Sequence, residues 1–182
     1  MIYYISDLHF RDERVFGLTR RPFKNVEEFE KYIISTWNLF IKSDDVVYIL
    51  GDIADDNHPE SIEIIKELNG QKHLIIGNHD LKNLKHYEKS NVFKSINHNL
   101  LIEDNGRKVF LCHYPVMDRM EFNRGGYHVY GHIHNKDLPD IKKYYKDKLA
   151  YNVSCDVIDF RPRTLDELIK LKEENIDEPY IN

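Results

Sequence analysis

Cysteine is scarce in this 182-residue chain, which contains only Cys112 and Cys155. Two cysteines without metal-type spacing exclude a disulfide-rich fold, and each adjoins an apolar run, which predicts buried, reduced thiols. Long apolar runs are lacking as well, since no stretch approaches the roughly 18–20 residues of a membrane span. The N-terminal residues also lack the basic region of a signal peptide. We therefore expect a cytoplasmic protein with no membrane partner.

Positive charge is not in excess, because 26 Lys and Arg stand against 31 Asp and Glu, which gives a formal net charge of −5. An acidic chain has no overall field that attracts nucleic acid, so a nucleic-acid partner is disfavoured. Internal repeats, low-complexity tracts and Gly/Ser linkers are also lacking. The sequence therefore predicts a single domain over residues 1–182, with a loose tail at 175–182.

Short apolar runs alternate with helical patterns along the chain, which is typical of an α/β fold. Asn25 and Glu28 have the spacing of a helix N-terminal cap, and apolar residues then recur at helical intervals. Thr164 and Glu167 show the same spacing near the end of the chain. Helices are predicted over three segments: 26–41, 59–68 and 165–174.

Eight short apolar runs predict β-strands. They lie at 2–5, 46–50, 73–76, 93–96, 100–103, 109–112, 127–130 and 149–153. Asn105 and Gly106 stand between two of these runs, and this dipeptide favours the tight turn of a β-hairpin.

Metal-competent side chains follow directly after five of the predicted strands. They are Asp7 and His9; Asp52; Asn78, His79 and Asp80; His113; and His132 and His134. In open α/β sheets, ligands bind outside the carboxyl ends of the strands, so strands that run the same way bring these groups to one edge. Asp7 and His9 are two residues apart, as are His132 and His134. In an extended segment this spacing places both members of a pair on the same side.

Without His79 and Asp80, this set offers seven oxygen and nitrogen donors from two Asp, one Asn and four His. Seven donors are too many for a single zinc centre with three or four ligands. They suit two ions that share a carboxylate, about 3.5–4 Å apart, as in two-metal phosphoryl-transfer sites. The lack of a thiolate favours manganese, iron, zinc, cobalt or nickel over calcium or Cu(I).

In order and spacing, five motifs resemble the signature of calcineurin-like metallophosphoesterases, in particular of their small, single-domain bacterial and phage subgroup. The motifs are Asp7-Leu8-His9, Gly51-Asp52, Gly77-Asn78-His79-Asp80, His113 and Gly131-His132-Ile133-His134. Segments that also resemble the subgroup are Arg21-Pro22-Phe23, Trp37-Asn38, 44–52 and 152–168. The resemblance implies an α/β fold with two facing mixed β-sheets flanked by helices.

The resemblance also implies roles for these residues and two divalent transition metals, manganese first, with iron, zinc, nickel or cobalt as alternatives. One ion is expected at Asp7, His9, Asp52 and His134. The second is expected at Asp52, Asn78, His113 and His132, with Asp52 as the bridge. The implied reaction is hydrolysis of a small or nucleotide-like phosphomono- or diester by a metal-bound hydroxide. His79 is expected to protonate the leaving group, oriented by Asp80.

Two other functions stand beside this one: a nuclease that acts on nucleic-acid ends, and a non-catalytic binding module that retains the fold. A nuclease needs a basic groove, whereas the Lys-rich stretch 142–148 is interpreted as a solvated face. The complete ligand set argues against the binding module. The Asp-Arg-Gly extension of Ser/Thr protein phosphatases does not follow Asp52, which argues against that class.

The segment after the first two ligands is rich in arginine and carries one aromatic residue: Arg11, Arg14, Arg20, Arg21 and Phe16. A guanidinium can bind phosphate through two hydrogen bonds and a phenyl ring can stack on a base, so Arg11 and Arg21 are candidate substrate-binding residues. The alternative is a set of solvated arginines with Phe16 in the core. At positions 11 and 12 the subgroup has Gly-His, whereas this chain has Arg11 and Asp12. This difference leaves the substrate preference open.

Overall fold

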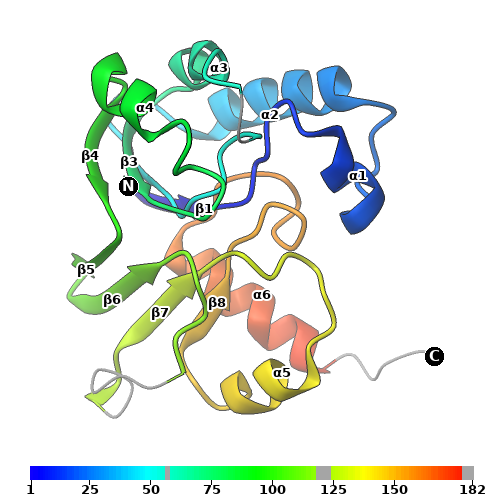
Figure 1. Cartoon of the computed structure of the whole chain (residues 1–182). Helices are drawn as coiled ribbons and strands as arrows, with labels where there is room; N and C mark the ends of the chain where they lie inside the picture. Colours follow the sequence, from blue (N-terminus) through cyan, green and yellow to red (C-terminus); the bar gives the residue numbers. More distant parts are fainter. Residues whose placement is uncertain (56–57, 118–123, 178–182) are drawn as a thin grey trace.

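Two four-stranded sheets, one above the other in Figure 1, form the centre of the computed structural model, which describes residues 1–55, 58–117 and 124–177. The first sheet is parallel and has the order β1 (Ile2–Ile5), β2 (Val46–Ile49), β3 (Gln71–Ile75) and β4 (Phe93–Asn97). The second has the order β5 (Asn99–Asp104), β6 (Arg107–Cys112), β7 (Tyr127–Tyr130) and β8 (Ala150–Asn152). Only the β5–β6 pair of this sheet is antiparallel among the described strands. The predicted α/β fold with two sheets is confirmed; the second sheet is mixed.

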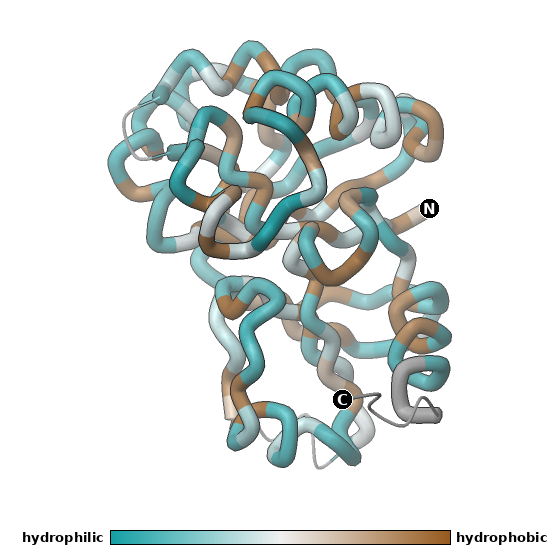
Figure 2. Tube along the Cα trace, turned by 90° about the vertical axis from the view of Figure 1, so that its right-hand side faces the viewer, coloured by the Kyte–Doolittle hydropathy of each residue, from teal (hydrophilic) through white to brown (hydrophobic). Residues whose placement is uncertain are grey.

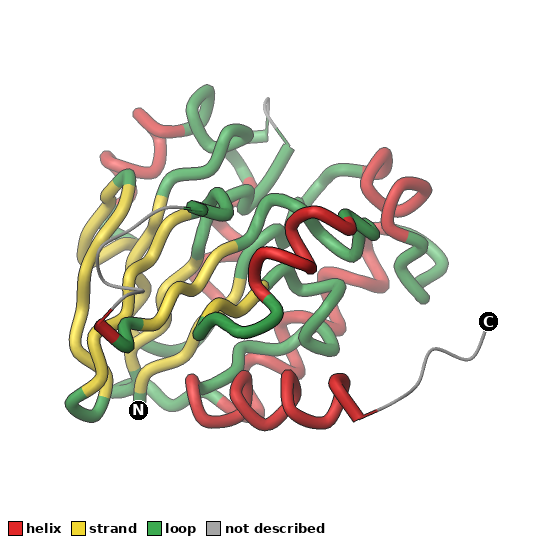
Figure 3. Tube along the Cα trace, turned by 90° about the horizontal axis from the view of Figure 1, so that it is seen from below, coloured by secondary structure: helices red, strands yellow, loops and turns green. Residues whose placement is uncertain are grey.

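Helices flank the strands, as Figure 3 shows from below. Their bounds are α1 (Glu13–Thr19), α2 (Val26–Phe40), α3 (Ser61–Glu67), α4 (Leu84–Ser90), α5 (Pro139–Tyr145) and α6 (Leu165–Asp177). The sequence predicted α2, α3 and α6. It missed α1, α4 and α5. Like α3, which it did predict, these helices have seven residues each, a length at which an apolar period is seldom clear.

The longest helix, α2, begins at its predicted cap, where the side chain of Asn25 accepts a hydrogen bond from the amide of Glu28 (2.9 Å). Its apolar face buries Phe29, Ile33 and Trp37 in the main core. The indole N–H of Trp37 also donates to the carbonyl of Asn69 (2.9 Å), so this side chain is buried without an unpaired donor. Each such buried side chain contributes roughly 1.5–3 kcal/mol to folding.

The last helix, α6, is amphipathic, and Figure 2 shows hydrophobic and hydrophilic residues alternating around its turns. Leu165 and Leu168 face the core. Thr164 and Glu167 form the predicted cap, in which each main-chain N–H donates to the side chain of the other residue (2.9 and 3.3 Å). The helix continues to Asp177, so the first part of the expected loose tail is helical; residues 178–182 lie outside the described residues.

The predicted hairpin turn joins β5 to β6, and Asn105 and Gly106 have φ angles of 50° and 77°, as a type I′ turn requires. In the Lys-rich stretch, Tyr145 is buried and its hydroxyl donates to the carbonyl of Val116 (2.7 Å). Its ring therefore packs inside the protein and is not presented to a nucleic acid. No helix in the described ranges is long and apolar enough to cross a membrane.

The two sheets meet where β1 and β8 end. The amide of Ser6 donates to the carbonyl of Val153 (2.8 Å), and the amide of Cys155 donates to the carbonyl of Ser6 (2.9 Å). These two bonds pair the segment after β1 with the segment after β8 in parallel, and so they connect the two sheets. The carboxyl ends of strands from the two sheets consequently open onto one common edge.

Candidate metal centre

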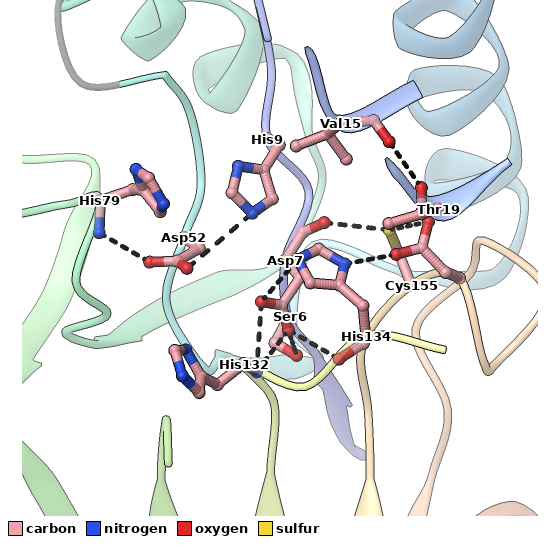
Figure 4. A network of polar contacts seen from close by, with 12 residues as sticks. Ser6, Asp7, His9, Val15, Thr19, Asp52, His79, His132, His134 and Cys155 are labelled. Atoms are coloured by element: carbon pink, nitrogen blue, oxygen red, sulfur yellow. Dashed lines mark hydrogen bonds and ion pairs between the residues drawn. The ribbon is translucent and has the colours of Figure 1, made fainter. Parts of the chain in front are cut away.

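Two groups of metal-competent side chains lie at this common edge. The groups are Asp7, His9 and His134, and Asp52, His113 and His132. In each group the three ligand atoms lie within 4.8 Å of one another. Opposite ligands of an ion that bonds at about 2.1 Å are about 4 Å apart, so each group has the size of a cation site. Figure 4 shows five of these side chains, those of Asp7, His9, Asp52, His132 and His134, coming together from several segments of the chain.

The first group is largely buried, and one of its members, His9, has ring nitrogens that the protein does not satisfy. Oδ1 of Asp7 lies 3.6 Å from Nε2 of His134. Both ring nitrogens of His9 are buried without a hydrogen-bond partner in the described part of the chain. Buried polar atoms are nearly always paired, and each orphan costs about 1–3 kcal/mol. The orphaned nitrogens of His9 therefore fit a site that a metal ion completes.

The second group adds an amide oxygen, as expected. Nε2 of His113 lies 3.3 Å from Oδ2 of Asp52 and 3.1 Å from Oδ1 of Asn78. The rings of His113 and His132 stand edge to face, with centroids 5.1 Å apart. The other ring nitrogen of His113 faces the carbonyl of Leu50 (2.7 Å), which fixes its orientation.

Asp52 lies between the two groups. Its Oδ2 atom is 3.3 Å from Nε2 of His113. The same atom is 3.8 Å from Nε2 of His9, a contact drawn in Figure 4. Its Oδ1 atom accepts a hydrogen bond from the amide of His79 (2.8 Å). One carboxylate oxygen thus faces a histidine of each group, which is the arrangement that a bridging ligand requires.

The ligand loops adopt backbone conformations that side chains other than glycine rarely take. The φ angles are 56° at Asp7, 50° at His9, 53° at Asp52, 71° at His132 and 52° at His134. The loops after β1 and β2 hold one another, because the amides of Asp7 and His9 donate to the carbonyls of Gly51 and Asp52 (both 3.0 Å). The segments expected to be extended thus contain left-handed residues at alternate positions. Such strain gathers at functional sites.

Gly131 permits a close approach between the loop after β7 and the loop after β1. A Cβ atom at this position would lie 2.5 Å from Oδ2 of Asp7 and would also overlap the side chain of Ser6. Only glycine lets the loop after β7 come this close to the first metal-ligand candidate.

His79 and Asp80 lie beside the two groups but have different surroundings. His79 is partly exposed, and its ring stands edge to face with that of His9, with centroids 5.1 Å apart. Asp80 is fully buried and accepts hydrogen bonds from the amides of Gly77 (2.7 Å), Asp52 (2.9 Å) and Ile53 (3.0 Å). Asp80 therefore fixes the backbone of two loops and does not orient the His79 ring, which corrects the expected role.

Charges at the second group are strongly coupled. Burial by itself raises the pKa of Asp52, but the nearby His113 and the amide of His79 hold it to about 2. Burial lowers the pKa of His113, yet the carboxylates of Asp52 and Asp7 outweigh this effect and raise it to about 9. The carboxylates therefore favour positive charge at this group, and a divalent ion bound there would supply that charge in place of a ring proton.

The arginine-rich segment divides into buried and exposed parts. Arg21 has a fully buried side chain, which donates to the carbonyls of Leu8 (2.8 Å) and Asp7 (2.7 Å). Its guanidinium also lies 4.4 Å from the ring centroid of Phe29. Arg21 thus holds the first ligand loop and has no surface for substrate, which corrects the expected contact. Phe16 packs edge-on against Phe29 in the core.

Sequence reasoning missed three side chains next to the ligands. The carboxylate of Asp156 lies 2.6 Å from Nδ1 of His134, and that of Asp12 lies 3.7 Å from Nδ1 of His9. Tyr114 is 44% exposed, and its ring packs against the rings of His113 and His132. Asp156 comes shortly after the end of β8, so the rule that identified the ligand candidates after five other strands could have found it if it had been applied to this strand.

Comparisons with known proteins agree with this geometry. Residues 1–152 match the profile of the calcineurin-like phosphoesterase superfamily domain. An uncharacterized protein of Methanocaldococcus jannaschii is 35% identical over 175 residues, 95% of this chain and 92% of that protein. The gene 66 protein of Mycobacterium phage L5 is 35% identical over 81 residues, 43% of this chain and 39% of that protein. The crystal structure of a protein of unknown function from Aquifex aeolicus matches with a TM-score of 0.72 and 30% identity, covering 94% of this chain and 98% of that one.

Proposed function

This chain belongs to the calcineurin-like phosphoesterase superfamily, and on this premise we propose that it hydrolyses small or nucleotide-like phosphomono- or diesters with two divalent ions. The strongest support comes from Asp52, whose Oδ2 atom faces His9 of one group and His113 of the other. A carboxylate shared in this way is what two ions about 3.5–4 Å apart require.

The two halves of the centre would hold one ion each. Asp7, His9, Asp52 and His134 would bind the first ion, and Asp52, Asn78, His113 and His132 the second. When bound, such ions supply an activated water molecule and neutralise charge that develops on the phosphate. Nitrogen and oxygen donors without a thiolate suit manganese, which we take as the first choice, ahead of iron, zinc, nickel and cobalt.

His79 would serve as the general acid. Its main chain is tied to Oδ1 of Asp52, and its partly exposed ring stands beside that of His9. An imidazole at this place can hold a proton for the departing alkoxide without giving up a bond to the ions. Asp80 would support His79 indirectly, because its carboxylate holds the amides of Gly77 and Asp52 in the loops beside it.

Arg11 would contact the phosphate or its substituent. It lies two residues after His9, and its side chain is 40% exposed, with Nη1 3.4 Å from the buried carboxylate of Glu30. A guanidinium offers five N–H donors, so one ion pair leaves others for a phosphate. Glu30 would then restrict the arginine to one orientation.

A substrate screen with manganese-loaded protein tests the function. The substrates would be p-nitrophenyl phosphate, bis(p-nitrophenyl) phosphate, cyclic nucleotides and a single-stranded oligonucleotide. Turnover of the small esters by the wild-type protein, and its loss in Asp52→Asn purified in the same way, is the expected result. Shortened oligonucleotide with no turnover of small esters would favour the nuclease. Equal turnover by both proteins would indicate a contaminating phosphatase and contradict the assignment.

A further inference from the structure

Asp156 is a buried carboxylate that belongs to neither group of metal-ligand candidates but contacts one of their members. Its side chain is 1% exposed, with Oδ2 2.6 Å from Nδ1 of His134 and Oδ1 2.7 Å from Nε of Arg21. A carboxylate buried beside a guanidinium stays ionised and can only accept hydrogen bonds. Nδ1 of His134 must therefore be the donor in this contact.

This hydrogen bond determines which ring nitrogen of His134 is available to a cation. With the proton on Nδ1, the neutral imidazole carries its lone pair on Nε2. That atom faces the carboxylate of Asp7, 3.6 Å from Oδ1. Asp156 thus fixes both the tautomer and the rotation of the ring toward the first group.

Arg21 connects Asp156 with the other ligand loop of the same group. Its Nη1 and Nη2 atoms donate to the carbonyls of Leu8 and Asp7, and Nη2 also lies 3.3 Å from the thiol of Cys155. The strained loop after β1 and the histidine after β7 are therefore held by one continuous buried chain, from Asp7 through Arg21 and Asp156 to His134.

In the second group, His113 is supported by a different kind of acceptor. Nδ1 of His113 faces the neutral carbonyl of Leu50 at 2.7 Å. A carboxylate behind a ligating histidine raises the basicity of the ring and holds it in place more strongly than a carbonyl does. The two halves therefore differ in how their histidines are supported.

We propose that Asp156 is a positioning residue for the half of the centre formed by Asp7, His9 and His134, and that Arg21 holds Asp156 in place. The role rests on the proposed metal centre and extends it, because it assigns a function to the segment after β8. It also means that a change at Asp156 affects one ion and leaves the other in place.

The test measures metal binding to purified Asp156→Asn and Asp156→Ala proteins, without any assay of activity. Co²⁺ titrations followed by visible absorption, with Mn²⁺ competition, give the affinity of each ion. We expect one of the two ions to bind roughly 10–100-fold more weakly in Asp156→Asn, and more weakly still in Asp156→Ala. The other ion should bind as in the wild-type protein. Asp156→Asn keeps the size of the side chain, so it decides the question if Asp156→Ala fails to fold.

A matched control is available in Asp104, a second buried carboxylate, which accepts a hydrogen bond from the hydroxyl of Tyr4 (2.9 Å). Asp104→Asn should lower the Tm of the metal-free protein without changing the affinity for either ion. Unchanged affinity for both ions in Asp156→Asn would overturn the positioning role, even if its Tm falls. Failure of the wild-type protein to bind two ions would instead refute the proposed function and, with it, this role.

Discussion

The amide of His132 donates to both carboxylate oxygens of Asp7, at 3.2 and 3.0 Å, although 125 residues separate the two in the chain. Oδ2 of Asp7 also accepts hydrogen bonds from the hydroxyls of Ser6 (2.5 Å) and Ser154 (2.8 Å). Donors from both sheets therefore fix this carboxylate before any cation arrives. Such advance ordering reduces the entropy that a metal ligand loses on binding.

Gly131→Ala should weaken metal binding because its Cβ would lie 2.5 Å from Oδ2 of Asp7. The loop after β7 must then move away, and His132 and His134 move with it. We expect a lower Tm, by several degrees, together with reduced affinity for both ions, measured by calorimetric unfolding and by metal titration. Gly17→Ala is the control, since its Cβ would meet nothing within 4 Å and Gly17 is an exposed position of α1. That change should stabilise the protein by roughly 0.5–1 kcal/mol and leave metal binding unchanged.

Fully loaded protein should contain two divalent ions per chain, and Asp52→Asn should impair both sites. The substitution removes the negative charge that both halves share. Bound ions contribute several kcal/mol of charge stabilisation in the transition state, so their weaker binding should lower kcat/KM by at least about 10²–10³-fold. Elemental analysis after metal loading and dialysis gives the stoichiometry. Full activity at one ion per chain would refute the dinuclear centre, and normal loading of the variant would refute the bridge.

His79→Asn should retain both ions but lose roughly 10²–10⁴-fold in kcat on an ester with a poor alkoxide leaving group. On a p-nitrophenyl ester the loss should be much smaller, because p-nitrophenolate departs without a proton. The comparison of the two substrates within one variant removes the effect of any general damage. Equal losses on both esters would show that His79 does something other than donate a proton.

Arg11→Ala should raise KM for the natural class of ester while metal content and Tm stay close to wild type. The reason is the exposed guanidinium beside the first ligand loop, held by Glu30. Arg20, exposed at the C-terminal end of α1, provides the control, and Arg20→Ala should leave KM unchanged. Arg21→Ala should behave differently from both, because loss of a buried guanidinium lowers the Tm. A KM that is equal in wild type and Arg11→Ala would remove Arg11 from substrate binding.

The sequence by itself determined the elements whose signals are local. The caps at Asn25 and Thr164 and the Asn105-Gly106 turn depend on hydrogen bonds and φ angles within a few residues, so their spacing in the chain was sufficient. The order of buried strands, each followed by a polar group, likewise predicted which side chains meet at one edge.

Only the tertiary structure decided which arginine is exposed and what the carboxylates contact. Arg11 and Arg21 belong to the same segment and have the same chemistry, yet Arg21 is buried by a partner 135 residues away, Asp156. Asp80 follows His79 directly, but its oxygens bind the amides of a loop that begins 28 residues earlier. Burial and hydrogen-bond partners depend on how distant segments pack, and no local pattern in the chain records that.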